Sequence, residues 1–278
     1  YNLSFINMSV HSEIKKITTE TLRKMKFDKE KITMLTAYDF TTAKMVDAGG
    51  VDSILIGDSA ANVMAGFETT LPITLDQMIY HTQCVVRGVE RALVVADLPF
   101  GTYQSNPEKA LESAVRMMKE GGAHAIKVEG GREIEESIRR IINAGIPVCG
   151  HLGLTPQSIY QFGTYKVRAK EDAEAEKLIS DCKLLEELGC FAIVLEKIPA
   201  SLAKKASESI SIPTIGIGAG QDCDGQVLVY HDMVGMNQGF SPKFLRRYLD
   251  LYTEITGAVS QYVKDVKSSD FPNDKESY

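Results

Sequence analysis

The chain has 278 residues, 44% of them hydrophobic and 24% charged, which is enough to bury one large core or two small ones. Its formal net charge of -6 argues against nucleic acid or acidic membranes as partners, because such binding depends on clustered Lys and Arg. We find no apolar run of the roughly 20 residues that a bilayer span needs, and no secretory signal pattern, so a cytoplasmic protein without membrane contact is expected.

The first segment is predicted to be an extension followed by a helix. Met8 is a plausible native start, so residues 1–7 are treated as upstream or added sequence. Residues 1–13 as a whole are expected to be disordered or introduced by cloning. The apolar spacing from Ile14 to Met25 then predicts a leading helix ahead of the main fold.

Eight short apolar runs, rich in Val and Ile, follow along the chain. They do not alternate with polar residues, which is typical of parallel strands that are buried on both faces. The runs are Ile32–Ala37, Ser53–Ile56, Ala92–Ala96, Ala125–Val128, Ile146–Cys149, Phe191–Leu195, Pro213–Ile217 and Gln226–Val229.

Helical patterns separate these runs, and each ends in glycine. The clearest covers Ser105–Glu120, with Pro107 in its first turn and apolar residues on one face. The same pattern recurs in Arg132–Asn143 and Asp172–Leu188, and a closing helix is expected over Pro242–Val266. The alternation favours an α/β fold, a closed (β/α)8 TIM barrel with an added N-terminal helix, over an open doubly wound sheet.

Domain organisation follows from the same pattern. Because no linker or shift of composition divides the chain, residues 14–267 are predicted to form a single barrel domain. Residues 268–278 are expected to be a polar C-terminal tail. The five cysteines form an odd set without CxxC spacing, which predicts reduced thiols in the core.

Polar side chains stand at the ends of the predicted strands, where a barrel of this kind places its reactive groups. A single carboxylate at such a position is often only a helix cap or turn residue, and that alternative stays open for Asp58 and Asp97 taken singly. Several together are harder to explain in this way, because carboxylates about 4 Å apart repel by roughly 4 kcal/mol at an effective dielectric near 20. The residues at the strand ends are Asp39, Asp58, Ser59, Asp97, Lys127, Glu129, His151 and Glu196.

A cation between the carboxylates would remove that repulsion. Ligands that are all oxygens, with sites left for water or substrate, favour Mg2+ over Zn2+.

His151 has two open interpretations, a core histidine that donates to a backbone carbonyl or a group of the site. His81 lies in a helical pattern that begins near Thr74, which favours a structural role.

The three glycines of the segment 216–220 do not form a nucleotide-binding fingerprint, and they are Gly216, Gly218 and Gly220. Their GxGxG spacing comes late in the chain, whereas a dinucleotide site needs GxGxxG opening a helix early in a βαβ unit. They are expected to let a loop pass close to a ligand or to a neighbouring strand end.

These motifs together resemble the ketopantoate hydroxymethyltransferase family. The resemblance covers roughly Ile32 to Phe244, and its most specific part is the block from His151 to Ser158. The segments that carry it are Thr36–Asp39, Ile56–Ser59, Thr70–Pro72, Tyr80–Thr82, Ala96–Phe100, Lys127–Gly131, Gly150–Ser158, Leu195–Glu196, Ile215–Gly220 and His231–Asp232.

The resemblance implies transfer of a hydroxymethyl group from 5,10-methylenetetrahydrofolate to 3-methyl-2-oxobutanoate, which forms 2-dehydropantoate in pantothenate and coenzyme A biosynthesis. It implies a Mg2+-stabilised enolate, with Glu196 as the general base that removes the proton at carbon 3. It also implies a homodecamer, a pentamer of dimers. In the implied site, the metal ligands are Asp58, Asp97 and Glu129, the last possibly through water, and the substrate-binding residues are Asp58, Ser59, Asp97, Lys127 and His151.

Two segments depart from a pattern common in the family. Ala60-Ala61-Asn62 and Arg168-Ala169-Lys170 replace Leu-Gly-Met-like and Gln-Gly-Arg sequences, and both are expected in loops near the rim. Two other functions are alternatives. A Mg2+-dependent carbon–carbon lyase on a related 2-oxo acid would share the enolate, but its KKCGH motif is absent, and a barrel that only binds a small acid would not need Glu196.

Overall fold

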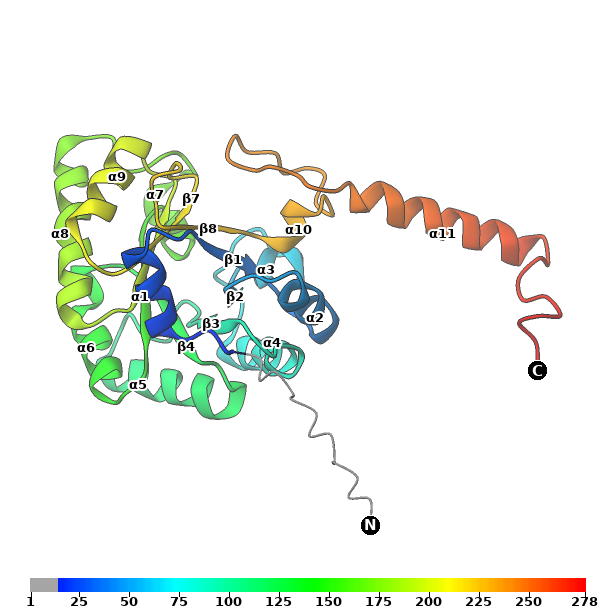
Figure 1. The fold of residues 1–278 in the computed structure, drawn as a ribbon, viewed down its shortest axis with the longest axis horizontal. Helices are drawn as coiled ribbons and strands as arrows, with labels where there is room; N and C mark the ends of the chain where they lie inside the picture. Colours follow the sequence, from blue (N-terminus) through cyan, green and yellow to red (C-terminus); the bar gives the residue numbers. More distant parts are fainter. Residues whose placement is uncertain (1–14) are drawn as a thin grey trace, which may run out of the picture.

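The protein is described by a computed structural model over residues 15–278. Eight parallel strands close into a barrel in which each strand pairs with the next and the last pairs with the first (Figure 1). The α/β barrel predicted from the sequence is therefore confirmed, and each expected run overlaps a strand, although β5 begins two residues later than expected and runs on to Gly153. The strands are β1 (Ile32–Thr36), β2 (Ser53–Ile56), β3 (Leu93–Asp97), β4 (Ala125–Glu129), β5 (Val148–Gly153), β6 (Ala192–Glu196), β7 (Thr214–Ile217) and β8 (Gly225–Leu228).

Helices surround the barrel, and short ones lie at its carboxyl end. The expected Asp172–Leu188 helix has the predicted bounds, while that over Ser105–Glu120 begins at Pro107 and passes into a π-helix at Met117. The α-helices are α1 (Thr19–Phe27), α2 (Phe40–Ala48), α3 (Ala60–Val63), α4 (Leu75–Gly88), α5 (Pro107–Arg116), α6 (Glu135–Asn143), α7 (Ile159–Phe162), α8 (Asp172–Leu188), α9 (Ala200–Ser209), α10 (Tyr230–Met233) and α11 (Leu251–Lys267). The π-helix η1 is Met117–Gly121, and the 3-10 helices are η2 (Arg132–Ile134) and η3 (Pro156–Ser158).

The interior of the barrel is filled and is closed at one end by α1. Leu22 and Met25 of this helix pack with Met34, Leu55 and Val95 from the strands in one buried cluster. A second cluster lies between the strands and the outer helices. Because side chains and α1 fill the amino ends of the strands, only the carboxyl ends are left for a cavity.

Both terminal helices begin later than predicted. The segment from Ile14 was expected to be helical, but α1 starts at Thr19, where Thr18 and Thr21 form a capping box. The structure does not describe Ile14 or the predicted N-terminal extension at residues 1–13. The closing helix starts at Leu251 instead of Pro242, because Asp250 is its N-cap and the residues before it form a loop.

The last helix stands away from the barrel. α11 projects outward in Figure 1 as a separate arm, and none of its residues is buried by the rest of the described chain. The residues after it, predicted to be a polar tail, are mostly turns and exposed. Across residues 15–278, no helix is both long and apolar enough to cross a membrane. All five cysteines are free thiols, and four of them are buried as predicted.

Candidate active site

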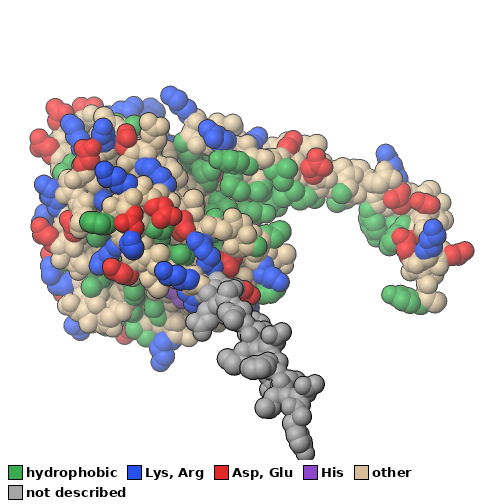
Figure 2. Space-filling view, in the orientation of Figure 1, with side chains coloured by type: hydrophobic (Ala, Val, Ile, Leu, Met, Phe, Trp, Pro, Cys, Tyr) green, Lys and Arg blue, Asp and Glu red, His purple; other side chains and the backbone are tan. Residues whose placement is uncertain are grey.

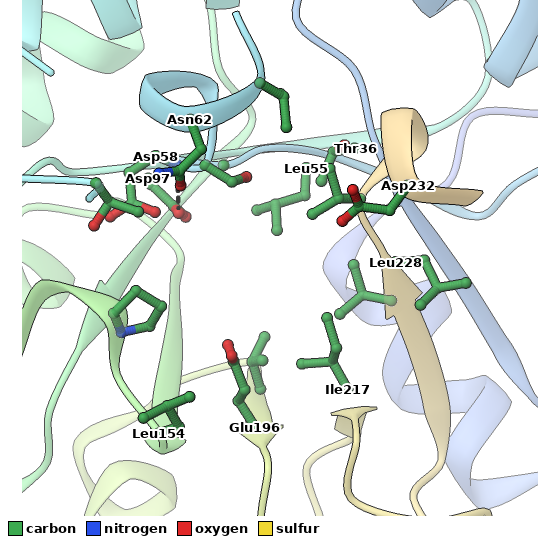
Figure 3. Close-up of a pocket in the computed structure, with 18 of the residues that line it drawn as sticks. Thr36, Leu55, Asp58, Asn62, Asp97, Leu154, Glu196, Ile217, Leu228 and Asp232 are labelled. Carbon is green, nitrogen blue, oxygen red and sulfur yellow. Dashed lines mark hydrogen bonds between the residues drawn. The ribbon is translucent and has the colours of Figure 1, made fainter. Parts of the chain in front are cut away.

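A cavity of about 470 Å³ opens at the carboxyl ends of the strands. Asp58, Asp97 and Asn62 stand at one end of it, Asp232 stands at the other, and Glu196 projects into it from a third side (Figure 3). The cavity brings together seven predicted site residues. These are Asp58, Ser59, Asp97, Lys127, Glu129, His151 and Glu196.

Asp58 and Asp97 lie side by side because β2 and β3 are neighbours. The backbone N–H of Asp58 donates to Oδ2 of Asp97 at 3.0 Å, and both side chains are buried. Gly57 leaves room for the Ser59 side chain, since a Cβ there would lie 2.7 Å from Oγ of Ser59. Burial, together with the charges of Glu129 and Asp97, raises the pKa of the Asp58 carboxyl to about 8.

Lys127 supplies a buried cation to this end of the cavity. It projects from β4, and its Nζ lies 3.1 Å from Oδ2 of Asp97. Burial alone would lower the pKa of Lys127, but the charges of Asp97, Glu129 and Asp58 outweigh it and raise the pKa above its usual value. The ammonium group is therefore charged at neutral pH and partly compensates the carboxylates.

Gln157 links three strand ends, two through its side chain and one through its backbone. Its Nε2 donates to Oδ2 of Asp58 at 2.9 Å and to the carbonyl of Leu98 at 3.0 Å. Its backbone N–H donates to Oε2 of Glu129 at 2.9 Å. The Tyr103 hydroxyl orients the Gln157 amide by donating to its Oε1 at 2.7 Å. Sequence reasoning gave Gln157 no role, although it lies in the segment of strongest family resemblance.

His151 connects the carboxylates to Glu196. The strand β5 runs on to Gly153, so His151 lies within the strand and not after it. Its Nδ1 lies 3.3 Å from Oε1 of Glu129, and its Nε2 lies 3.4 Å from Oε2 of Glu196. Burial and the charge of Lys127 act to lower the pKa of the His151 imidazole. The contacts with the carboxylates of Glu129 and Glu196 outweigh them and raise this pKa to about 9. The side chain therefore contacts acidic groups, and not the backbone carbonyl of the structural alternative.

The donor set suits a hard cation. Among the buried side-chain atoms of residues 15–278, Oδ1 of Asp97 and Oε1 of Glu129 are two of the few without a hydrogen-bond partner. Within the same residues, no three His, Cys, Asp or Glu side chains are already grouped closely enough to hold an ion by themselves. Carboxylate oxygens at neighbouring strand ends that lack a hydrogen-bond partner are the ligands that a hard cation such as Mg2+ prefers, so the residues present fit such an ion.

Asp39 and His81 have structural roles. Asp39 caps α2 by accepting hydrogen bonds from the N–H and hydroxyl of Thr42, at 2.9 and 2.6 Å. It does not line the cavity, so its inclusion among the rim groups was wrong and the helix-cap alternative applies. His81 lies in α4 with its Nδ1 2.8 Å from the carbonyl of Tyr38, which agrees with the structural role predicted for it.

The end of the cavity opposite Asp58 and Asp97 is apolar and is formed partly by the loop 236–250. Gly218, with φ of +63°, lies against this loop, and a Cβ there would meet the ring of Phe244 at 3.1 Å. This contact confirms the expectation that the glycines of this segment allow a close approach. The apolar lining of this end includes Ile217, Leu228, Phe240, Phe244 and Leu245.

Of the two departures from the family pattern, Ala60-Ala61-Asn62 was expected in a loop but begins α3, whereas Arg168-Ala169-Lys170 lies in a loop as expected. Asn62 lines the cavity and donates to the carbonyl of Phe67 at 2.9 Å, while Ala60 and Ala61 are buried in the core. Arg168 stacks over the ring of Phe162 at 4.0 Å and pairs with Glu174, outside the cavity lining.

A closed barrel with buried carboxylates, a lysine and a histidine at the carboxyl ends of its strands defines a TIM-barrel enzyme acting on a small molecule. The sequence profile of ketopantoate hydroxymethyltransferase matches residues 16–274. The chain belongs to the ketopantoate hydroxymethyltransferase family, which confirms the resemblance and the enzyme class that it implied.

Relatives are similar over nearly the whole chain. A 3-methyl-2-oxobutanoate hydroxymethyltransferase from Flavobacterium johnsoniae is 71% identical over 266 residues, which are 96% of this chain and 98% of the relative. One from Christiangramia forsetii is 68% identical, with the same shares covered. Among solved structures, a phosphonopyruvate hydrolase in complex with oxalate and Mg2+ superposes with a TM-score of 0.61 over 94% of this chain and 93% of that one. Its sequence identity of 13% indicates a shared fold alone.

Proposed function

We propose that this chain transfers a hydroxymethyl group from 5,10-methylenetetrahydrofolate to 3-methyl-2-oxobutanoate, forming 2-dehydropantoate for pantothenate and coenzyme A synthesis. The observation that carries the proposal is the buried group of Asp58, Asp97, Glu129 and Lys127, with Glu196 facing the same cavity from β6. Membership in the family supports it independently.

The charges at this end of the cavity favour a divalent cation and an acid together. Asp58, Asp97 and Glu129 carry three potential negative charges, which Lys127 and His151 only partly compensate. We propose that Asp58 and Asp97 hold Mg2+ directly and that Glu129 does so through water. When bound, the ion supplies positive charge for the oxygen of the oxo acid that becomes negative as the proton at carbon 3 leaves.

Residues of the chain then bind the oxo acid and move its proton. We assign to Lys127 and Ser59 the binding of the oxo acid, and the Ser59 hydroxyl is oriented by that of Tyr38 at 2.7 Å. Glu196 stands across the cavity from Asp58 and Asp97 (Figure 3) and is the base that takes the proton from carbon 3. His151, between Glu129 and Glu196, holds the carboxylate of Glu196 in position.

The test is the reaction itself. Purified protein with Mg2+, 3-methyl-2-oxobutanoate and 5,10-methylenetetrahydrofolate is expected to form 2-dehydropantoate, and in deuterated water without folate it should exchange the proton at carbon 3. Isocitrate-like substrates are the comparison for the lyase alternative, which no contact in the site favours. Cleavage of such a substrate without hydroxymethyl transfer would overturn the proposal, and a barrel that only binds acids would show no exchange.

We further propose the homodecamer that the family resemblance implies. Support comes from α11, whose apolar residues recur three or four positions apart and are each 41–57% exposed. These are Tyr252, Ile255, Val259, Tyr262, Val263 and Val266. Hydrophobic side chains also gather where the barrel joins this arm (Figure 2). Light scattering during size-exclusion chromatography would give the subunit number directly.

A further inference from the structure

The cavity is larger than the oxo acid requires. Its volume of about 470 Å³ falls in the range that accommodates drug-sized ligands, whereas the proposed oxo acid has only five carbons. The groups assigned to that acid, Asp58, Asp97 and Lys127, stand together at one end. The rest of the space is bounded by apolar side chains of β7, β8 and the loop 236–250, so it suits a second and flatter ligand.

Asp232 is the acidic group at that far end. It lies in α10, directly after β8, is 6% exposed, and faces the cavity in Figure 3. Within residues 15–278 the hydrogen bond found for its carboxylate is one from Nδ2 of Asn237, at a long 3.4 Å. Burial raises the pKa of this carboxyl, although Asn237 and the charge of Arg247 oppose the effect. A buried carboxylate so poorly supplied with donors is suited to accept hydrogen bonds from a ligand.

We propose that Asp232 recognises the pterin ring of the folate co-substrate, and this inference rests on the proposed function. A pterin presents two adjacent donors, the ring N3–H and the 2-amino group, and a carboxylate can accept both in a bidentate pair. Ile217, Leu228 and Phe244 offer apolar surface to the faces of the ring.

The position of Asp232 also suits the transfer. Glu196 projects into the cavity from a third side, so that it, Asp232 and the pair formed by Asp58 and Asp97 surround one space (Figure 3). A ring held by Asp232 therefore approaches the carbon that Glu196 deprotonates from the side away from the carboxylates. Thr70, whose buried Oγ1 is among the few unpartnered polar atoms of the described chain, lines the same cavity and can bond a further polar atom of the ring.

The first experiment uses Asp232→Asn, which keeps the volume of the side chain and an oxygen for Asn237 but no longer offers two acceptors. We expect the Kd of tetrahydrofolate to rise at least tenfold, while the KM of the oxo acid changes less than twofold. Asp222→Asn is the matched control, because Asp222 is exposed and does not line the cavity. Unchanged binding of tetrahydrofolate in Asp232→Asn would overturn the inference.

The second experiment changes the ligand and needs no variant to fold. The 2-desamino-2-methyl analogue of tetrahydrofolate lacks the 2-amino group, one of the two donors proposed to bind Asp232, so the natural protein should bind it at least tenfold more weakly. In Asp232→Asn this preference should shrink to about twofold. A natural protein that binds both compounds equally would contradict the proposal.

Exchange of the carbon 3 proton separates this inference from the proposed function, because it requires no folate. If the natural protein neither exchanges nor forms product, the proposed function fails, and with it the inference. If the natural protein is active and Asp232→Asn binds tetrahydrofolate normally, the inference alone fails. Exchange by Asp232→Asn at close to the natural rate shows that the fold and the oxo-acid end are intact.

Discussion

The two ends of the cavity are built in different ways. At the carboxylate end, Asp58, Asp97, Lys127 and Glu129 come from strands or directly follow them, and hydrogen bonds from backbone and from Gln157 fix them. At the apolar end, the surface comes from α10 and the loop 236–250, which the Arg247 guanidinium holds together. The barrel thus places the proposed chemistry on its most rigid part and co-substrate recognition on a loop.

The largest expected effect is the loss of the metal. Because the proposed Mg2+ supplies the positive charge that stabilises the developing negative charge of the oxo acid, the metal-stripped protein should have no measurable turnover. Adding Mg2+, Mn2+ or Co2+ should restore it, and binding of the ion can be followed by calorimetry. Full turnover in excess chelator would show that the carboxylate end has another purpose.

The variant Glu196→Gln tests the proposed general base. Loss of the general base should reduce turnover by roughly 10² to 10⁴-fold and abolish exchange at carbon 3, while metal and oxo acid still bind. Glu208→Gln on α9, at an exposed position, is the matched control. Near-normal turnover of Glu196→Gln would remove this residue from the reaction.

Lys127→Met tests how much of the negative charge of the carboxylates is compensated by the Lys127 ammonium group when no metal is bound. The variant removes a buried cation beside Asp97, which should lower the free energy of unfolding by about 3–5 kcal/mol in metal-free protein. Urea denaturation measures the change, and saturating Mg2+ should recover part of it. A loss below about 1 kcal/mol would mean that the carboxylates are largely protonated before metal binds.

Gln157→Leu tests the crosslink between strand ends. The variant loses the side-chain hydrogen bonds to Asp58 and Leu98 but keeps the backbone bond to Glu129. Misplaced ligands should weaken Mg2+ binding about 10- to 100-fold, as measured by calorimetry. Unaltered affinity would show that the strands alone hold the carboxylates in place.

The smallest effect is expected at the loop. Arg247→Met removes hydrogen bonds from the guanidinium to the carbonyls of Asn237, Gln238 and Phe240, at 3.0 to 3.2 Å. A cost of about 1 kcal/mol corresponds to a rise of about fivefold in the KM of methylenetetrahydrofolate, with that of the oxo acid unchanged. Equal increases in both KM values would indicate that the two ends are not independent.

The sequence predicted the barrel well because burial on both faces leaves a strong pattern of short apolar runs. It also located the carboxylate end, since parallel strands bring their carboxyl ends to one rim. Asp39 was misplaced because a carboxylate before a helix has the same local pattern whether it caps or lines a site.

Contacts between distant segments were harder to predict. Gln157 reaches Asp58 across 99 residues of sequence, and an amide in a loop has no periodic signal. In the sequence, Asp232 stands out only as part of the segment His231–Asp232. Its burial in the cavity could not be predicted, because the neighbouring loop was predicted to be helical from Pro242. The apolar residues of that segment match a helical spacing, but the start of α11 is set by the Asp250 cap.

The arm formed by α11 bears on how the chain can change through evolution. Since the described barrel does not bury this helix, substitutions at Tyr252, Ile255 or Val259 leave the packing of its own barrel untouched. Selection on these positions then acts only through the surface that covers them, and in the proposed assembly that surface belongs to a neighbouring copy. In that assembly one gene encodes both α11 and the surface that covers it. A substitution in either therefore occurs in every subunit at once.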